Sequence, residues 1–179
     1  MASRPLYYIT DGVVPYRSLT VFDKYGTLYY AALSNSHRLL MPFLESAFRD
    51  QPAYRLLPLE KCKTNKLNIH DNWEKFKLLV DNASHQEDIP YKYIFGTPSD
   101  HKVWDELRKL RPGEIKTAEQ LADSLGMDAE AVENSCYANK LAMVVPTHRV
   151  IGLGRVDTDK RMYTHFLSQE EPGKREWNN

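Results

Sequence analysis

Asn-Lys-Leu-Ala-Met-Val-Val-Pro-Thr-His-Arg-Val-Ile-Gly, residues Asn139 to Gly152, is the stretch around which the rest of this chain can be interpreted. Its apolar run from Leu141 to Val145 ends at Pro146. Three polar residues follow directly, and they are Thr147, His148 and Arg149. This order predicts a buried segment that delivers three polar side chains to a common site.

Two short helices are expected immediately before this stretch. Thr117 and Gln120 have the spacing of a capping box, and Gly126 can end the helix that they open. Asp128 is placed to cap a second helix over residues 129–137. Two short helices joined in this way predict a helix-turn-helix. Because most helix pairs in globular proteins are merely packed together, the pair alone does not establish DNA binding.

A further helix is expected upstream, and a small sheet before it. Thr97, Pro98 and Asp100 mark a helix start, and Arg111-Pro112-Gly113 should stop that helix. The N-terminal half has strand patterns at 6–9, 17–22, 27–33 and 54–59, with a turn at 23–26 and an earlier one at Asp11-Gly12, and helical patterns from Ser36 and over 71–80. We therefore predict an α+β N-terminal domain over 1–90, a helical domain over 91–170 and a polar tail over 171–179.

Composition limits the possible functions. Lysine plus arginine number 24 and aspartate plus glutamate number 24, so the chain lacks the global positive field that supplies most non-specific nucleic-acid affinity. Cys62 and Cys136 have neither zinc-ligand spacing nor the pattern of a disulfide framework. No apolar run approaches the length of a membrane span. We expect an intracellular protein, nuclear or cytoplasmic, with no metal, no cofactor and no membrane association.

Position by position, the opening stretch resembles the active-site segment of the O6-alkylguanine-DNA alkyltransferases. The family pattern is Pro-Cys-His-Arg-Val after an asparagine eight residues before the cysteine. The matching residues are Asn139, Pro146, His148, Arg149 and Val150, whereas Thr147 stands at the cysteine position. The Tyr-Ile-Phe-Gly-Thr lead-in of residues 93–97 is close to fungal-type members. The resemblance implies a ribonuclease H-like N-terminal domain followed by a DNA-binding helix-turn-helix domain.

The same resemblance exposes four departures from the family's repair chemistry. Thr147 is not ionised near neutrality, unlike a thiol. The glutamate that completes the family's histidine relay aligns with His165. Glu130 and Ala118 align with the arginine and tyrosine that flip the damaged base, and Lys160 aligns with a tyrosine of the lesion pocket. On this alignment, DNA binding should be weak or lost, and Thr147→Cys alone should restore no activity.

From these departures we expect a catalytically inactive pseudoenzyme that serves as a protein-interaction module or complex subunit. Its surface candidates are Asp128, Glu130, Glu133 and Tyr137, together with the tail from Glu170. The first alternative is a non-catalytic lesion-binding protein, and the second is an active transferase that uses Thr147 or Cys136. Within the site, Asn139 should tie its turn by side-chain to backbone bonds, and Arg149 should pair with a carboxylate or with backbone carbonyls.

Overall fold

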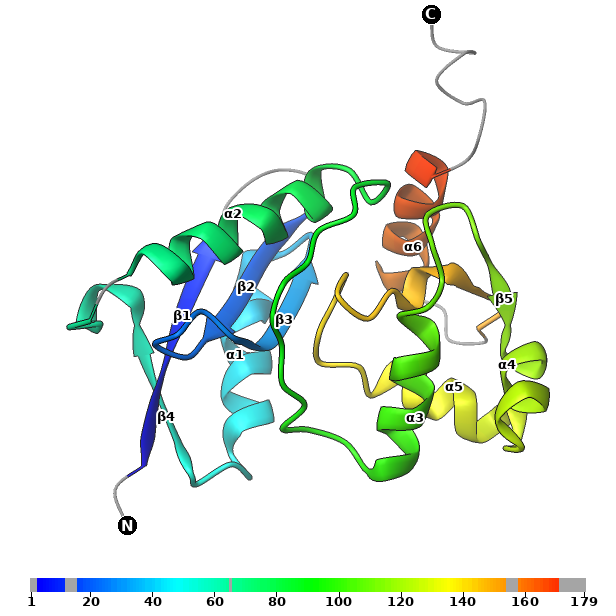
Figure 1. Ribbon diagram of the computed structural model, residues 1–179, viewed down its shortest axis with the longest axis horizontal. Coiled ribbons are helices and arrows are strands. Elements are labelled where there is room, and N and C mark those ends of the chain that lie inside the picture. The colour runs from blue at the N-terminus through cyan, green and yellow to red at the C-terminus, as the bar shows by residue number, and fades with distance from the viewer. Residues whose placement is uncertain (1–2, 12–15, 65, 154–157, 171–179) are drawn as a thin grey trace, which may run out of the picture. The chain divides into compact units, whose positions relative to one another are not determined.

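The computed structural model describes residues 3–11, 16–64, 66–153 and 158–170 (Figure 1). The chain forms two compact units, of which the first comprises Met1–Lys77 and Asp88–Lys92 and the second Leu78–Glu87 and Tyr93–Asn179. The predicted ranges 1–90 and 91–170 place residues 78–87 in the first domain, whereas the structure groups this segment with the second unit. The predicted tail, 171–179, lies outside the described residues.

The first unit is built on a four-stranded sheet with the strand order β3-β2-β1-β4. The strands are β1 (Arg4–Asp11), β2 (Arg17–Phe22), β3 (Leu28–Ser34) and β4 (Tyr54–Pro58). The first three pair antiparallel, and β4 returns parallel to β1. The predicted turn at 23–26 is present, since the Gly26 amide donates to the Asp23 carbonyl oxygen at 3.0 Å. The other predicted turn, Asp11-Gly12, falls partly outside the described residues.

Helices α1 (His37–Phe48) and α2 (Leu67–Asp81) and a short 3-10 turn, η1 (Leu59–Lys61), complete the N-terminal elements. The α1 helix packs on β2 and β3 through Leu40, Leu44 and Phe48, which recur every fourth residue and are buried. Ser36 is the N-cap residue of α1, but its side chain makes no capping hydrogen bond. The α2 helix begins four residues before the predicted range, because Ile69 is also buried on its inner face.

The second unit is mainly helical. It contains α3 (Pro98–Leu107), α4 (Ala118–Leu125), α5 (Ala129–Tyr137) and α6 (Thr158–Glu170), the 3-10 turn η2 (Thr147–Arg149) and the short parallel pair β5 (Lys116–Thr117) and β6 (Val150–Ile151). Figure 1 shows α3, α4 and α5 grouped together. The α3 helix ends at Leu107, earlier than predicted, because residues 108–110 continue only as turns.

The capping residues set where the helices of this unit start. Thr97 and Asp100 form a complete capping box at α3, and Thr117 and Gln120 form another at α4. Gly126 ends α4 in the left-handed conformation, at φ 65°, so that α5 can fold back onto α4. The predicted helix-turn-helix is therefore present, although the Asp128 side chain makes no capping bond at α5.

A polar clamp fixes α5 against α3. The Trp104 indole nitrogen donates to the Ser135 carbonyl oxygen at 2.7 Å, and the Ser135 hydroxyl donates to the Asp100 carboxylate at 2.6 Å. Trp104 and Ser135 are both buried. The expected α+β fold is thus confirmed, and its second unit holds the helix-turn-helix at a fixed position on α3. Among the described residues, no helix has the length and apolar character needed to cross a membrane.

Candidate functional site

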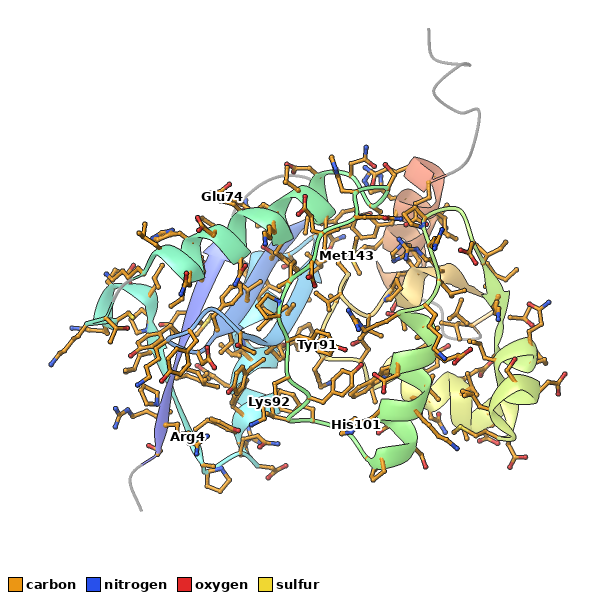
Figure 2. The ribbon with its side chains drawn as sticks, viewed as in Figure 1. Arg4, Glu74, Tyr91, Lys92, His101 and Met143 are labelled. Atoms are coloured by element: carbon orange, nitrogen blue, oxygen red, sulfur yellow. The ribbon has the colours of Figure 1, made fainter. Side chains whose placement is uncertain are left out.

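The segment that leads into the site is less uniformly buried than predicted. Leu141 and Val145 are buried, whereas the three residues between them are only half-buried. Met143, labelled in Figure 2, has a φ of 71°, which is uncommon for a residue other than glycine. This conformation accompanies a tight turn in which the Val145 amide donates to the Leu141 carbonyl oxygen at 2.9 Å. The turn brings the Val145 carbonyl back to Asn139, which follows the end of α5 by two residues.

Asn139 holds both this turn and Thr147. Its side-chain amide donates to the Val145 carbonyl oxygen at 3.0 Å and to the Thr147 hydroxyl oxygen at 3.1 Å, and its carbonyl oxygen accepts from the Leu141 amide at 2.8 Å. The predicted tie of the turn by Asn139 is therefore observed. The bond to Thr147 adds a second role, because it orients the hydroxyl of a residue that is only 5% exposed.

The residues after Thr147 form a buried network with Glu170, at the end of α6. His148 Nε2 lies 2.9 Å from Glu170 Oε1, and three contacts of 2.8–3.2 Å join the Arg149 guanidinium to the same carboxylate. Arg149 also donates to the Leu110 carbonyl oxygen at 2.6 Å. Arg149 thus has both of the partners expected for it, a carboxylate and backbone carbonyls.

This network corrects the prediction that the histidine relay is dismantled. The partner of His148 is Glu170, and not His165, with which the family's glutamate was expected to align. Glu170 is also not part of an exposed tail, because it is 7% exposed. A sequence signal for this position existed. Met162, Phe166 and Glu170 are four residues apart, so one face of α6 buries all three.

The charge states in this network follow from its surroundings. Burial lowers the pKa of His148, and Arg149 lowers it further, against the opposing effect of Glu170. Burial raises the pKa of Glu170, but hydrogen bonds from His148 and Arg149 outweigh burial and hold it below the ordinary value. Near neutral pH, the group therefore consists of a carboxylate, a guanidinium and a neutral imidazole. Since a carboxylate only accepts, His148 Nε2 carries the proton and Nδ1 has the free lone pair.

Acidification should destabilise the folded protein through this network. In the unfolded chain His148 takes up a proton near its ordinary value of 6.5, but in the folded protein its pKa is lower. The unfolded state then binds more protons, so stability is lost as the pH falls below about 6.5. Glu170 adds a further loss below about 4.5, because its pKa is also lowered on folding. We expect the free energy of unfolding, measured in urea between pH 8 and pH 5, to depend less steeply on pH in His148→Asn. An unchanged slope would contradict this assignment.

Neither cysteine provides a thiolate at this site. Burial and the nearby Glu133 carboxylate raise the pKa of Cys136 to about 12, so its thiol stays protonated near neutrality. Cys136 is 1% exposed and packs as a small apolar residue, as expected. Cys62 belongs to the first unit, where it is buried and its sulfur contacts Thr64.

The helix-turn-helix presents the other predicted residues in different ways. Ala118 is buried at the start of α4, so it cannot reach a DNA backbone. Asp128 and Glu130 are exposed around the first turn of α5, whereas Glu133 and Tyr137 are half-buried further along it. The exposed N-terminal part of α5 is thus acidic. The predicted pocket position Lys160 and the loop 154–157 lie where side chains are not described.

Comparison with known proteins places these features in a family. Residues 98–164 match the family model described as "6-O-methylguanine DNA methyltransferase, DNA binding domain". A Candida albicans protein named methylated-DNA–protein-cysteine methyltransferase is 36% identical over 93% of this chain and 96% of its own length. The protein of that name from Scheffersomyces stipitis is 35% identical over 95% of each chain.

Solved structures give the same fold. The Mycobacterium tuberculosis O6-methylguanine methyltransferase superposes with a TM-score of 0.67, at 18% identity and over 97% of this chain and 99% of that one. The Mycobacterium tuberculosis protein in complex with DNA gives 0.63 at 18% identity, again over 97% of this chain and 99% of that one. These likenesses confirm the expected alkyltransferase fold.

The relatives also correct two predictions about function. Proteins that match nearly the whole chain carry the name of an enzyme, which contradicts the expectation of an inactive pseudoenzyme. The family model that residues 98–164 match is described as a DNA-binding domain, so the comparisons favour DNA over the protein partner that was expected. The effect of the acidic α5 surface is therefore considered below for the binding of DNA, and not for the binding of another protein.

Proposed function

Because this chain belongs to the methylated-DNA–protein-cysteine methyltransferase family, we propose that it acts on alkylated duplex DNA and transfers the alkyl group to one of its own side chains. The observation that carries the proposal is that His148 and Arg149, directly after residue 147, both bond to the buried carboxylate of Glu170. A buried carboxylate that orients a neutral histidine is the arrangement with which enzymes take a proton from a nucleophile. Apolar residues often stabilise a core as well as a buried ion pair does, so stability alone does not require charged residues at these positions.

The proposed acceptor is the Thr147 hydroxyl, which lies where the relatives' name implies a cysteine. Its oxygen attacks the alkyl carbon, and the bond from that carbon to guanine O6 breaks. His148 Nδ1 takes the threonine proton, and Glu170 stabilises the resulting imidazolium. The imidazolium then gives this proton up through solvent, and the leaving guanine takes one up at its ring nitrogen, so that His148 is neutral again. The products are an O-alkyl threonine and an unmodified guanine, so each protein molecule reacts once.

A hydroxyl acceptor makes the reaction slow. An alcohol is essentially never ionised near neutrality, and it depends fully on the neighbouring base. The bond from Asn139 fixes the hydroxyl at the site but does not deprotonate it. We therefore expect reaction times far longer than those of a thiolate in the same position.

The decisive experiment is intact-mass analysis of the full chain after long incubation with duplex DNA that contains one O6-benzylguanine. We expect a mass increase of one benzyl group, which peptide mapping places on Thr147 and which Thr147→Val abolishes. An adduct on Cys62 or Cys136 would show that the acceptor is assigned wrongly while alkyl transfer stands. An unchanged mass for the protein, with the lesion intact in the DNA, would overturn the proposed function.

Replacing Glu130 by arginine should strengthen duplex binding. Glu130 is exposed in the first turn of α5, where its carboxylate repels phosphate, and arginine there reverses the sign of the charge. We expect affinity to rise by about tenfold at low salt, with a salt dependence steeper by about one counterion. Fluorescence anisotropy with a labelled duplex measures both quantities. Glu74→Arg, an equal charge change in the first unit, is the control, and an equal gain in both variants would refute the assignment to α5.

A further inference from the structure

The first unit contains a cavity of about 420 Å³ beside the turn that joins β2 to β3. This volume is within the range of small-molecule sites, about 300–1,000 Å³. The residues of its lining that matter here are aromatic or charged, and they are Arg4, Asp23, Lys24, Tyr25, Tyr29 and Tyr54. None of them belongs to the site around Thr147, which is in the second unit.

Three tyrosines line the cavity, and one of them has an exposed ring. Tyr29 and Tyr54 meet edge to face with their ring centres 5.6 Å apart, and Tyr29 is buried. Tyr25, at the tip of the turn, is 68% exposed. A large aromatic ring held in water beside a cavity offers a face on which another aromatic ring can stack.

The charges favour an anion. The Asp23 carboxylate is occupied within the turn, since Oδ1 accepts from the Tyr25 and Thr27 amides at 2.9 and 3.0 Å. Its Oδ2 accepts from the Tyr29 hydroxyl at 3.2 Å. Burial and Asp23 raise the pKa of Tyr29 to about 12, so this hydroxyl remains a donor.

Among the described residues, the two cations of the lining are not paired with a carboxylate, and the Lys24 Nζ lies 5.1 Å from the centre of the Tyr25 ring, which leaves the opposite face of that ring for stacking. Arg4 and Lys24 are exposed, and neither forms a salt bridge among the residues that the structure describes. Lys92 is not part of the lining, but its Nζ lies 5.9 Å from the centre of the Tyr29 ring, which is. Figure 2 labels Arg4 and Lys92. The planar guanidinium of arginine suits a phosphate, because two of its N–H groups can donate to it together.

We propose that this cavity binds a nucleotide unit, with the base stacked on Tyr25 and the phosphate held by Arg4 and Lys24. Stacking is tolerant of base identity, so we expect little preference among the bases. The unit can belong to a free nucleoside monophosphate or to the 5′ end of a single strand, since the recognised chemistry is the same. This site does not depend on alkyl transfer at Thr147, and its test uses no alkylated DNA.

Isothermal titration of the full chain with thymidine 5′-monophosphate, thymidine and inorganic phosphate measures the two halves of the site. We expect the monophosphate to bind at least about tenfold more tightly than either part alone, since stacking and phosphate contacts add. Tyr25→Ala should weaken binding by about fivefold or more, and Arg4→Gln with Lys24→Gln by about tenfold or more. Both changes alter exposed side chains, so folding should be preserved, and circular dichroism verifies this.

Arg38→Gln is the matched control, because it removes an exposed cation of the same unit outside the cavity. It should leave the affinity unchanged. Competition with a 5′-phosphorylated single strand then separates the two sources: displacement of the monophosphate indicates a strand end, and no displacement indicates a free nucleotide. Failure of the monophosphate to bind at millimolar concentration would overturn the proposal. So would equal binding of phosphate alone, or an equal loss of affinity in Arg38→Gln.

Discussion

Thr147→Cys should accelerate alkyl transfer by about three orders of magnitude or more, because a thiol near pH 7 is a few per cent thiolate whereas an alcohol is not measurably ionised. The new thiol would directly precede His148 in the chain, and the His148 imidazole contacts the Glu170 carboxylate. Pseudo-first-order rates with fluorescently labelled benzylguanine, followed on denaturing gels, measure the gain.

This expectation reverses the one drawn from sequence, in which Thr147→Cys restores no activity. That prediction depended on three losses together, namely the arginine at position 130, the tyrosine at position 118 and the relay, and the structure supplies the relay through Glu170. Thr147→Ser is the control, because it keeps a hydroxyl while removing the methyl group. It should react at a rate close to that of the unsubstituted protein. A cysteine variant no faster than the serine variant would show that the positions of Glu130 and Ala118, and not the acceptor atom, limit the reaction.

Glu170→Gln should destabilise the protein by about 3–5 kcal/mol, since it removes one partner of a buried ion pair and leaves the other uncompensated. The side chains of Glu170 and Arg149 are 1% and 10% exposed. A glutamine oxygen can still accept one hydrogen bond, but it cannot balance the guanidinium charge. Urea denaturation followed by circular dichroism measures the change in the free energy of unfolding.

The control for this variant is Glu74→Gln. Glu74 also pairs with a cation, Lys77 at 2.9 Å, but its side chain is 63% exposed. Solvent-exposed pairs contribute little, so this variant should stay within about 0.5 kcal/mol of the unsubstituted protein. Equal stability of the two glutamine variants would refute the structural role of Glu170.

Adding Glu170→Gln to the Thr147→Cys background should also slow alkyl transfer by about 100-fold, the usual contribution of an oriented base.

Local sequence was sufficient for much of the second unit. The capping boxes at Thr97 and Thr117 place the starts of α3 and α4, and Gly126 places the end of α4, because their bonds join residues three or four apart. The strands of the first unit were also predictable from their apolar and β-branched residues. The boundary between the units was not, since the segment 78–87 joins the second unit through long-range bonds, such as the one that the Ala83 amide donates to the Gln169 side-chain oxygen at 2.9 Å.

The candidate site shows where local information stops. The sequence alone determined that a helix-turn-helix is followed by an asparagine-bound turn and by Thr147, His148 and Arg149, because each of these features depends on neighbours within about ten residues. Only the tertiary structure decided what those residues can do. Glu170 lies 22 residues beyond His148, and α6 must fold back before its carboxylate meets the imidazole and the guanidinium. An alignment across that interval selected His165, whereas burial of the face of α6 that carries Met162 and Phe166 selects Glu170.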